Sequence, residues 1–263
     1  MLRKTFVIAI IVCLMAVAQA GAVTFSEATG SDLPGRASGG APRLVAGPYV
    51  QNMTTTAVTI MWQTDIPSTA ELHIRGDDIH EKYRASGARR LSEVRVTGLA
   101  PGTSYTYSLK PTGSVDGKAE VSFRTFPAKD EPIKFILYGD TRSGPARHKQ
   151  IIDAMDAEHD ISFVLHTGDV VNRGSELESW VPMFFTPARR MIRSVPFYFE
   201  LGNHEGNSPY YFKYFALPGG ERWYSFDVAE IHVIGLDSHG ARRGCAARSG
   251  RRPACASRFD RAL

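Results

Sequence analysis

The sequence predicts an all-β sandwich followed by a partial α/β sandwich domain, and three observations lead to this. Short strands of alternating polarity, separated by Pro and Gly turns, follow one another between residues 43 and 127. After the polar linker at Lys129–Pro132, apolar runs alternate with stretches of helical spacing. Residues 241–263 then lose all apolar periodicity. The chain of 263 residues is long enough for two ordinary domains.

The positive charge of the chain is concentrated at its two ends. The formal net charge is +4, but residues 241–263 carry seven Arg and one Asp, and residues 1–20 carry two basic residues and no acid. The middle of the chain is therefore net negative. The basic pI gives no indication of a nucleic-acid partner, and the oligomeric state cannot be inferred from the sequence.

Residues 1–20 have the three-part pattern of a cleaved signal peptide: a basic start, an apolar run and Ala18-Gln19-Ala20. We expect cleavage after Ala20, a flexible leader over 21–42, and a secreted or periplasmic protein. An uncleaved membrane anchor is the alternative. No later stretch is apolar enough to cross a bilayer, and residues 21–240 contain no Cys, which suits an exported protein without a disulfide framework.

The first domain, residues 43–127, is expected to contain five short strands, with Trp62 as a large core residue. The run Leu99-x-Pro101-Gly102-Thr103-x-Tyr105-x-Tyr107 resembles the tyrosine-corner region of a fibronectin type III domain. A tyrosine there packs its ring inward while its hydroxyl group bonds to nearby backbone. The expected strands are 57–62, 70–74, 93–96, 105–109 and 120–126.

The second domain, residues 132–240, is expected to form a mostly parallel sheet with right-handed crossovers. Its strands are predicted at 133–138, 161–166 and 195–199, and helices at 145–159 and about 176–193. Ile151, Ile152 and Met155 mark the apolar face of the first helix, and His148 and His159 fit its surface. Pro182 and Pro187 interrupt the second helix. Two further strands, 222–228 and 231–236, are joined by a turn at residues 229–230.

Each of the three parallel strands runs into a glycine followed by a polar residue. These loops are Gly139-Asp140-Thr141-Arg142, Gly168-Asp169 and Gly202-Asn203-His204-Glu205. Because sites in such sheets lie at the carboxyl ends of the strands, we expect one composite polar site. Carboxylates with an Asn and a His suit divalent metal ions, and a pair of such ions can generate hydroxide and clamp a phosphoryl group.

The three loops, in this order, resemble the calcineurin-like metallophosphoesterase superfamily. With a fibronectin-III-like domain ahead of them, residues 43–240 look like a purple acid phosphatase. The resemblance implies two divalent or trivalent metal ions (Fe, Zn or Mn) and a phosphate-ester substrate. It implies that Asp140 binds the first metal, Asp169 bridges both and Asn203 binds the second, while His204 assists the leaving group. The alternative for each residue is an ordinary turn or loop role.

Two positions depart from the family pattern. Purple acid phosphatases carry an iron-binding Tyr three residues after the bridging Asp, where this chain has Asn172. Asn172 is expected beside the ligands, and a role as a direct ligand is the alternative. Many superfamily members carry a His two residues after the first Asp, where this chain has Arg142. Arg142 either contacts substrate phosphate or lies exposed to solvent. His166 is expected to pack within its strand.

The later part of the family pattern is missing from this sequence. The family requires a further loop histidine and a Gly-His-x-His pair, but only His232 and His239 follow Glu205, and His232 lies mid-strand. The Arg-rich residues 241–263 resemble out-of-frame translation. We therefore expect a truncated or frameshifted phosphatase domain. A genuine basic tail that binds an anionic surface is the alternative.

Two functions follow from these observations. The first is a metal-dependent phosphoesterase whose activity is impaired by the missing histidines. The second is a non-catalytic chain in which the fibronectin-like domain acts as a binding or spacer module.

Overall fold

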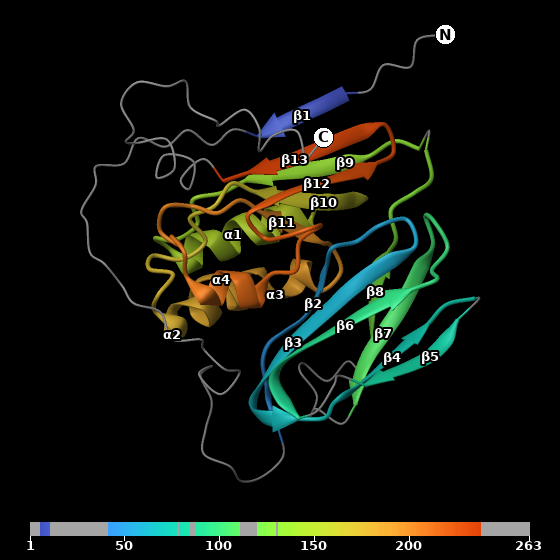
Figure 1. The fold of residues 1–263 in the computed structure, drawn as a ribbon, viewed down its shortest axis with the longest axis horizontal. Helices are drawn as coiled ribbons and strands as arrows, with labels where there is room; N and C mark the ends of the chain where they lie inside the picture. Colours follow the sequence, from blue (N-terminus) through green and yellow to red (C-terminus); the bar gives the residue numbers. More distant parts are fainter. Residues whose placement is uncertain are drawn as a thin grey trace, which may run out of the picture.

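The computed structural model of the chain describes residues 6–10, 42–77, 79–84, 88–110, 120–129 and 131–237 (Figure 1). A β-sandwich and an α/β unit lie against each other, and the two parts follow each other in the chain. The predicted tail at 241–263, His239 and nearly all of the predicted leader at 21–42 lie outside the described residues.

The first domain is a sandwich of two antiparallel sheets, as predicted. One sheet has the order β2-β3-β6 and the other β5-β4-β7-β8. Two strands, β2 and β5, were not predicted: β2 contains a Gly-Pro pair, and β5 is short and strongly charged. The bounds are β2 Leu44–Gln51, β3 Ala57–Ser68, β4 Glu71–Arg75, β5 His80–Arg84, β6 Arg89–Thr97, β7 Ser104–Lys110 and β8 Val121–Arg124.

The tyrosine corner predicted from the sequence is present. Tyr105 is buried and stacks on Phe123 with ring centroids 5.7 Å apart. Its hydroxyl oxygen accepts a hydrogen bond from the backbone N–H of Ala100 at 2.8 Å. Trp62 is also fully buried, as expected for the core of this domain. The corner therefore closes the turn before β7 with a buried and satisfied phenol.

The second domain contains a parallel sheet with the order β11-β10-β9 and a second sheet with the order β1-β13-β12. The parallel β-α-β-α-β arrangement confirms the prediction. β12 and β13 form an antiparallel hairpin whose turn holds Ala229 at a φ of 50°. The bounds are β9 Lys134–Tyr138, β10 Ile161–His166, β11 Phe197–Phe199, β12 Trp223–Val228 and β13 Ile231–Leu236.

The helices of this domain differ from the prediction in their details. The buried face of α1 carries His148, Ile152 and Met155, whereas Ile151 is 40% exposed. The sequence analysis placed Ile151 on the apolar face and His148 on the surface, and both predictions were wrong. The spacing of apolar residues cannot indicate that a histidine is buried. The predicted interrupted helix consists of α2, a π-helical turn at Val181–Phe185 and α3, with a proline in the first turn of each of the last two segments. The helices are α1 Pro145–Asp156, α2 Leu177–Trp180, α3 Thr186–Ile192 and α4 Pro209–Tyr214.

The two faces of the parallel sheet have different partners because side chains alternate along a strand. On one face, Phe163 and Tyr198 pack against Phe226 of β12, with ring centroids 5.6 and 4.0 Å away. On the other face, His166 and Phe199 contact Phe184 of the π-helical turn. The sheet is thus covered on both sides, and its polar loops remain at the edge.

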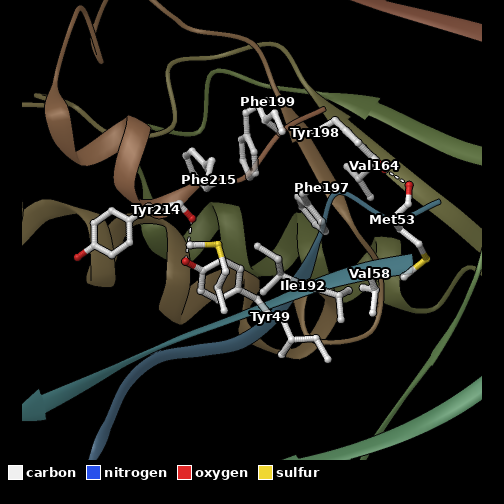
Figure 2. Packing of buried hydrophobic residues seen from close by; sticks show 14 of the residues in the cluster. Tyr49, Met53, Val58, Val164, Ile192, Phe197, Tyr198, Phe199, Tyr214 and Phe215 are labelled. Atoms are coloured by element: carbon white, nitrogen blue, oxygen red, sulfur yellow. Dashed lines mark hydrogen bonds between the residues drawn. The ribbon is translucent and has the colours of Figure 1, made fainter. Parts of the chain in front are cut away.

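The two domains share one continuous core (Figure 2). Tyrosine hydroxyl groups cross the boundary in both directions. Tyr49 of β2 donates to the Tyr214 carbonyl oxygen at 2.7 Å, and Tyr198 of β11 donates to the Met53 carbonyl oxygen at 3.0 Å. Tyr107 of β7 donates to the Arg193 carbonyl oxygen at 2.8 Å. Each hydroxyl group satisfies a backbone acceptor, so the aromatic rings can be buried without leaving polar atoms unpaired.

The strand β1, Phe6–Ile10, lies inside the predicted signal segment. It pairs in parallel with β13, with Phe6 opposite Ile231 and Ile10 opposite Gly235. A cleaved signal peptide would not keep this contact, so cleavage after Ala20 remains a prediction. Among the described residues, no helix is both long and apolar enough to cross a membrane.

Candidate active site

The three polar loops meet at the carboxyl edge of the parallel sheet and are joined by backbone hydrogen bonds. The N–H of Asp140 donates to the Gly168 carbonyl oxygen at 3.0 Å. The N–H of Arg142 donates to the Asp169 carbonyl oxygen at 3.1 Å. The N–H of Glu200, directly before the third loop, donates to the His166 carbonyl oxygen at 2.8 Å. The first loop thus lies on the second, and the third loop leaves from beside it.

The glycines before these polar residues permit the loops to approach closely. A Cβ atom on Gly202 would lie 2.2 Å from Oδ1 of Asp169, and one on Gly168 would lie 2.7 Å from the Gly202 nitrogen. Asp140 and Asp169 both have a φ of 56°, in the left-handed region that costs most residues energy but that Asp tolerates better than most. The same loop conformation is therefore built twice, at the ends of two neighbouring strands.

Glu205 anchors the second loop to the third. Its Oε2 accepts backbone hydrogen bonds from Asp169 at 2.8 Å and from Gly202 at 3.0 Å, and its Oε1 accepts one from Val171 at 3.0 Å. The side chain is buried, and burial raises the pKa of Glu205 to about 7, although the backbone donors favour the ionised form. One carboxylate thus holds three backbone N–H groups around Asp169 in place.

His204 is oriented by a backbone carbonyl group of the second loop. Its Nδ1 lies 2.6 Å from the carbonyl oxygen of Asn172, so Nδ1 carries the hydrogen. Its backbone N–H donates to Oδ1 of Asp169 at 3.1 Å. Within the part of the chain that the structure describes, Nε2 of His204 has no hydrogen-bond partner. Asn172 therefore orients His204 through its backbone carbonyl group, and the residue itself is exposed.

An open hollow of about 590 Å³ lies beside His204. Its lining includes Asn172, Asn203 and His204, together with Ser208 and Pro209 at the start of α4. Ser208 caps α4 by accepting a hydrogen bond from the Tyr210 N–H, and its hydroxyl group donates to the Gly174 carbonyl oxygen at 2.6 Å. The lining of the hollow therefore includes the capped start of α4 as well as the histidine.

Arg142 lies between the first two carboxylates. Its Nε is 2.9 Å from Oδ1 of Asp140 and 3.3 Å from Oδ2 of Asp169. The side chain of Asp140 is 67% exposed, whereas that of Asp169 is 4% exposed. The sequence left two roles open for Arg142, a contact with substrate phosphate or exposure to solvent. In the structure its guanidinium group instead pairs with two of the predicted metal ligands.

His166 packs beneath the loops, as expected. The Gly168 N–H donates to its Nδ1 at 3.2 Å, so the hydrogen lies on Nε2, which is 3.1 Å from the Thr141 hydroxyl oxygen. Burial, with His148 nearby, lowers the pKa of His166 to about 3. The imidazole is therefore a neutral support that links the first two loops from below.

Two functional roles were missed by sequence reasoning: the anchoring by Glu205 and the carbonyl contact of Asn172. The neighbours of Glu205 in the sequence are polar residues and glycines, so nothing local indicates that its carboxylate is buried against backbone donors. The Asn172 contact involves a main-chain atom that every residue possesses. No side-chain pattern can therefore reveal it.

The residues of this edge fit only part of a dinuclear metal centre. Asp140, Asp169 and Asn203 offer the oxygen ligands that suit one hard cation. Among the residues that the structure describes, no three His, Cys, Asp or Glu side chains gather in a group that could hold a metal ion. His232 is bonded to Asp227 at 2.7 Å, in the β12–β13 hairpin. A donor set for two metal ions is therefore not present in the described part of the chain.

Comparison with solved structures identifies the architecture. A purple acid phosphatase from seeds of yellow lupin (Lupinus luteus) superposes with a TM-score of 0.58 at 16% sequence identity. The match covers 84% of this chain and 47% of the lupin enzyme, so this chain spans about half the length of that protein. At this identity the likeness shows the fold alone.

Fibronectin domains also match, over the first part of the chain. The fifth fibronectin domain of Drosophila Lar covers 36% of this chain and 99% of its own length, with 19% identity and a TM-score of 0.23. The domain FN3tt covers 33% of this chain and 96% of its own length, with 18% identity and a TM-score of 0.23. Scores this low carry no weight, and the sandwich assignment rests on the sheet order given above.

Sequence comparison adds the family of the second domain. No curated protein sequence matches the chain. The sequence model of the calcineurin-like phosphoesterases, however, matches residues 133–249, a span that includes all three strand-end loops. Over these residues the second domain is therefore similar to the calcineurin-like phosphoesterases.

Proposed function

We propose that the edge formed by Asp140, Asp169, Asn203 and His204 is a site for the metal-dependent hydrolysis of phosphate esters. One observation carries this proposal: the backbone N–H of His204 donates to Oδ1 of Asp169 at 3.1 Å, which joins the second loop to the third. A buried carboxylate and an oriented imidazole thus lie together at the carboxyl ends of parallel strands, beside an open hollow.

Asp140, Asp169 and Asn203 would hold the cation, which by family resemblance is Fe, Zn or Mn. Such an ion, when bound, supplies Lewis acidity and an activated water molecule. The protein's own contribution is the fixed position of Asp169, whose carboxylate is held between the His204 N–H and Arg142. Glu205 keeps the surrounding backbone from moving.

His204 is the proton donor to the leaving oxygen in this proposal. Because the Asn172 carbonyl oxygen accepts from Nδ1, Nε2 is the ring nitrogen that can act on the substrate. The imidazolium form donates its Nε2 proton to the departing alkoxide and is then left with hydrogen on Nδ1 alone. The Asn172 carbonyl oxygen thereby favours the neutral tautomer with hydrogen on Nδ1 after the transfer.

The substrate class proposed is a phosphate monoester or a related diester. The donor set of the described residues lacks the histidine ligands that the family resemblance implies, so we expect slow turnover. We also propose, from the sequence pattern of residues 1–20, that the protein is exported and begins at Gly21 in its mature form. Mass spectrometry of the expressed protein tests the export step, and an intact N-terminus would overturn it.

The hydrolysis proposal is tested with p-nitrophenyl phosphate in the presence of Mn²⁺, Fe²⁺ or Zn²⁺. We expect Asp169→Ala to abolish turnover, because it removes the buried carboxylate of the edge. Asp153→Ala is the matched control, since Asp153 lies on α1 and pairs with Lys149 at 2.6 Å. Turnover that survives Asp169→Ala, or that falls equally in both variants, would overturn the assignment of the site.

A further inference from the structure

Arg142 is a fixed positive charge inside the proposed metal site. Its Nε lies 2.9 Å from Oδ1 of Asp140 and 3.3 Å from Oδ2 of Asp169. Its backbone N–H also donates to the Asp169 carbonyl oxygen at 3.1 Å. Side chain and main chain therefore both hold Arg142 against the second loop.

We propose that Arg142 is an internal cation that takes the place of one metal ion between Asp140 and Asp169, so that the edge accepts at most one exchangeable divalent ion. The inference rests on the proposed function, since it concerns the same ligands. It agrees with the finding that no three His, Cys, Asp or Glu side chains gather into a metal-binding group among the described residues.

The physical reason is the charge of the two aspartates. The Asp169 side chain is 4% exposed, and a carboxylate this buried requires a compensating charge. Arg142, at 30% exposure, supplies that charge without any metal. An ion that binds the same oxygen atoms must displace the guanidinium group or share the carboxylates with it.

The arginine side chain competes with a metal ion for the two carboxylates and cannot itself become a ligand of that ion. Its guanidinium group stays protonated at all accessible pH values and has no lone pair to donate. A histidine at this position, as the family resemblance implies for many members, would lose its proton and coordinate the ion. A histidine at position 142 would therefore raise the metal affinity of the site, whereas Arg142 lowers it.

The test is a titration of the purified full-length chain with Mn²⁺, followed by calorimetry and by the electron paramagnetic resonance signal of free Mn²⁺. We expect wild type to bind no more than one Mn²⁺, and Arg142→Gln to bind Mn²⁺ about tenfold or more tightly. Arg142→Lys, which keeps the charge, should stay near the wild-type affinity. Arg190→Gln is the control, since Arg190 pairs with Asp156 at 2.8 Å and its side chain is 72% exposed.

A second measurement detects the same exchange without any activity. In metal-free protein, Arg142→Gln leaves the two carboxylates uncompensated, so the melting temperature should fall by about 2–4 °C. Addition of Mn²⁺ should restore it in this variant and raise it less in wild type. The control variant should show neither change.

Three outcomes would overturn the inference: two Mn²⁺ per wild-type chain, equal affinity in wild type and Arg142→Gln, or no Mn²⁺ binding by either. The proposed function is judged separately by turnover. Tighter Mn²⁺ binding by Arg142→Gln without ester hydrolysis upholds the inference and refutes the function. Ester hydrolysis by a wild-type chain that binds two Mn²⁺ would uphold the proposed function and refute the inference about Arg142.

Discussion

The boundary between the two domains and the loop edge use neighbouring parts of the same stretch of chain, yet they are stabilised in different ways. Phe197, Tyr198 and Phe199 are fully buried among aromatic rings, with many partners each. A few residues later, the loop at 201–205 depends on the hydrogen bonds of one carboxylate, Glu205. The boundary is held by redundant apolar packing, whereas the edge is held by a small number of directional contacts.

This difference predicts how each region responds to the loss of one side chain. Apolar packing is non-directional, and the loss of one partner leaves the others in place. A hydrogen-bonded loop anchor has no substitute when its acceptor is removed. We therefore expect changes at the boundary to affect the stability of the whole chain, and changes at the edge to affect local order and ligand binding.

The largest effect is expected from Tyr198→Ala at the boundary. The variant loses the stack on Phe226, with ring centroids 4.0 Å apart, and leaves the Met53 carbonyl oxygen without its donor. The free energy of unfolding should fall by about 3–5 kcal/mol, measured by urea denaturation. Tyr198→Phe keeps the ring and should cost only about 1 kcal/mol.

The same experiment separates the two functional interpretations of the first domain. Because the domains share a core, we expect one unfolding transition, and Tyr198→Ala should shift all of it. A variant that unfolds in two steps, with a protease-resistant sandwich left behind, would favour an independent binding or spacer module instead.

An intermediate effect is expected at Glu200, which lies where the two regions meet. Its Oε1 accepts from the Tyr224 hydroxyl group at 3.0 Å, and burial raises its pKa to about 7 from 4.5. The folded state therefore binds a proton that the unfolded state releases between these pH values, so Glu200 lowers stability as pH rises from about 4.5 to 7. Glu200→Gln should be more stable than wild type at pH 8, by on the order of 2–3 kcal/mol.

This advantage of Glu200→Gln should disappear as the pH falls towards 4.5, where both side chains are neutral. Denaturation curves collected across pH 4.5–8 measure the difference. Glu205 contributes to the pH dependence of both proteins in the same direction, so their difference isolates Glu200. A constant difference at all pH values would show that the substitution acts through packing rather than charge.

The smallest effect on global stability is expected from Glu205→Gln at the edge. The amide NH₂ group must face one of the three backbone donors, which should cost about 1–2 kcal/mol. The local effect should be larger: hydrogen exchange at the Asp169, Val171 and Gly202 amides should accelerate more than elsewhere. Glu178→Gln, exposed on α2, is the control. Uniform acceleration over the whole chain would contradict an anchoring role.

Sequence reasoning was most successful where the signal was local. The largely apolar run 161–166 predicted β10 with its observed bounds, and the motif with Tyr105 and Tyr107 predicted a tyrosine hydroxyl bonded to nearby backbone, which Tyr105 provides. It was less successful where burial ran against residue type. His148 is polar but buried, and Ile151 is apolar but exposed, because the position of α1 against the π-helical turn decides which helix face is covered.

Local signals in the sequence were sufficient to predict the two-part fold and the three polar loops at strand ends, because periodicity, turns and glycine placement act over a few residues. The position of Arg142 between Asp140 and Asp169, and the contacts of Glu205 with the loop around Asp169, depend on the packing of the folded chain. These contacts join loops that are about thirty residues apart in the sequence. Which charge or donor a side chain meets across such a distance depends on how the strands align, and no local pattern encodes it.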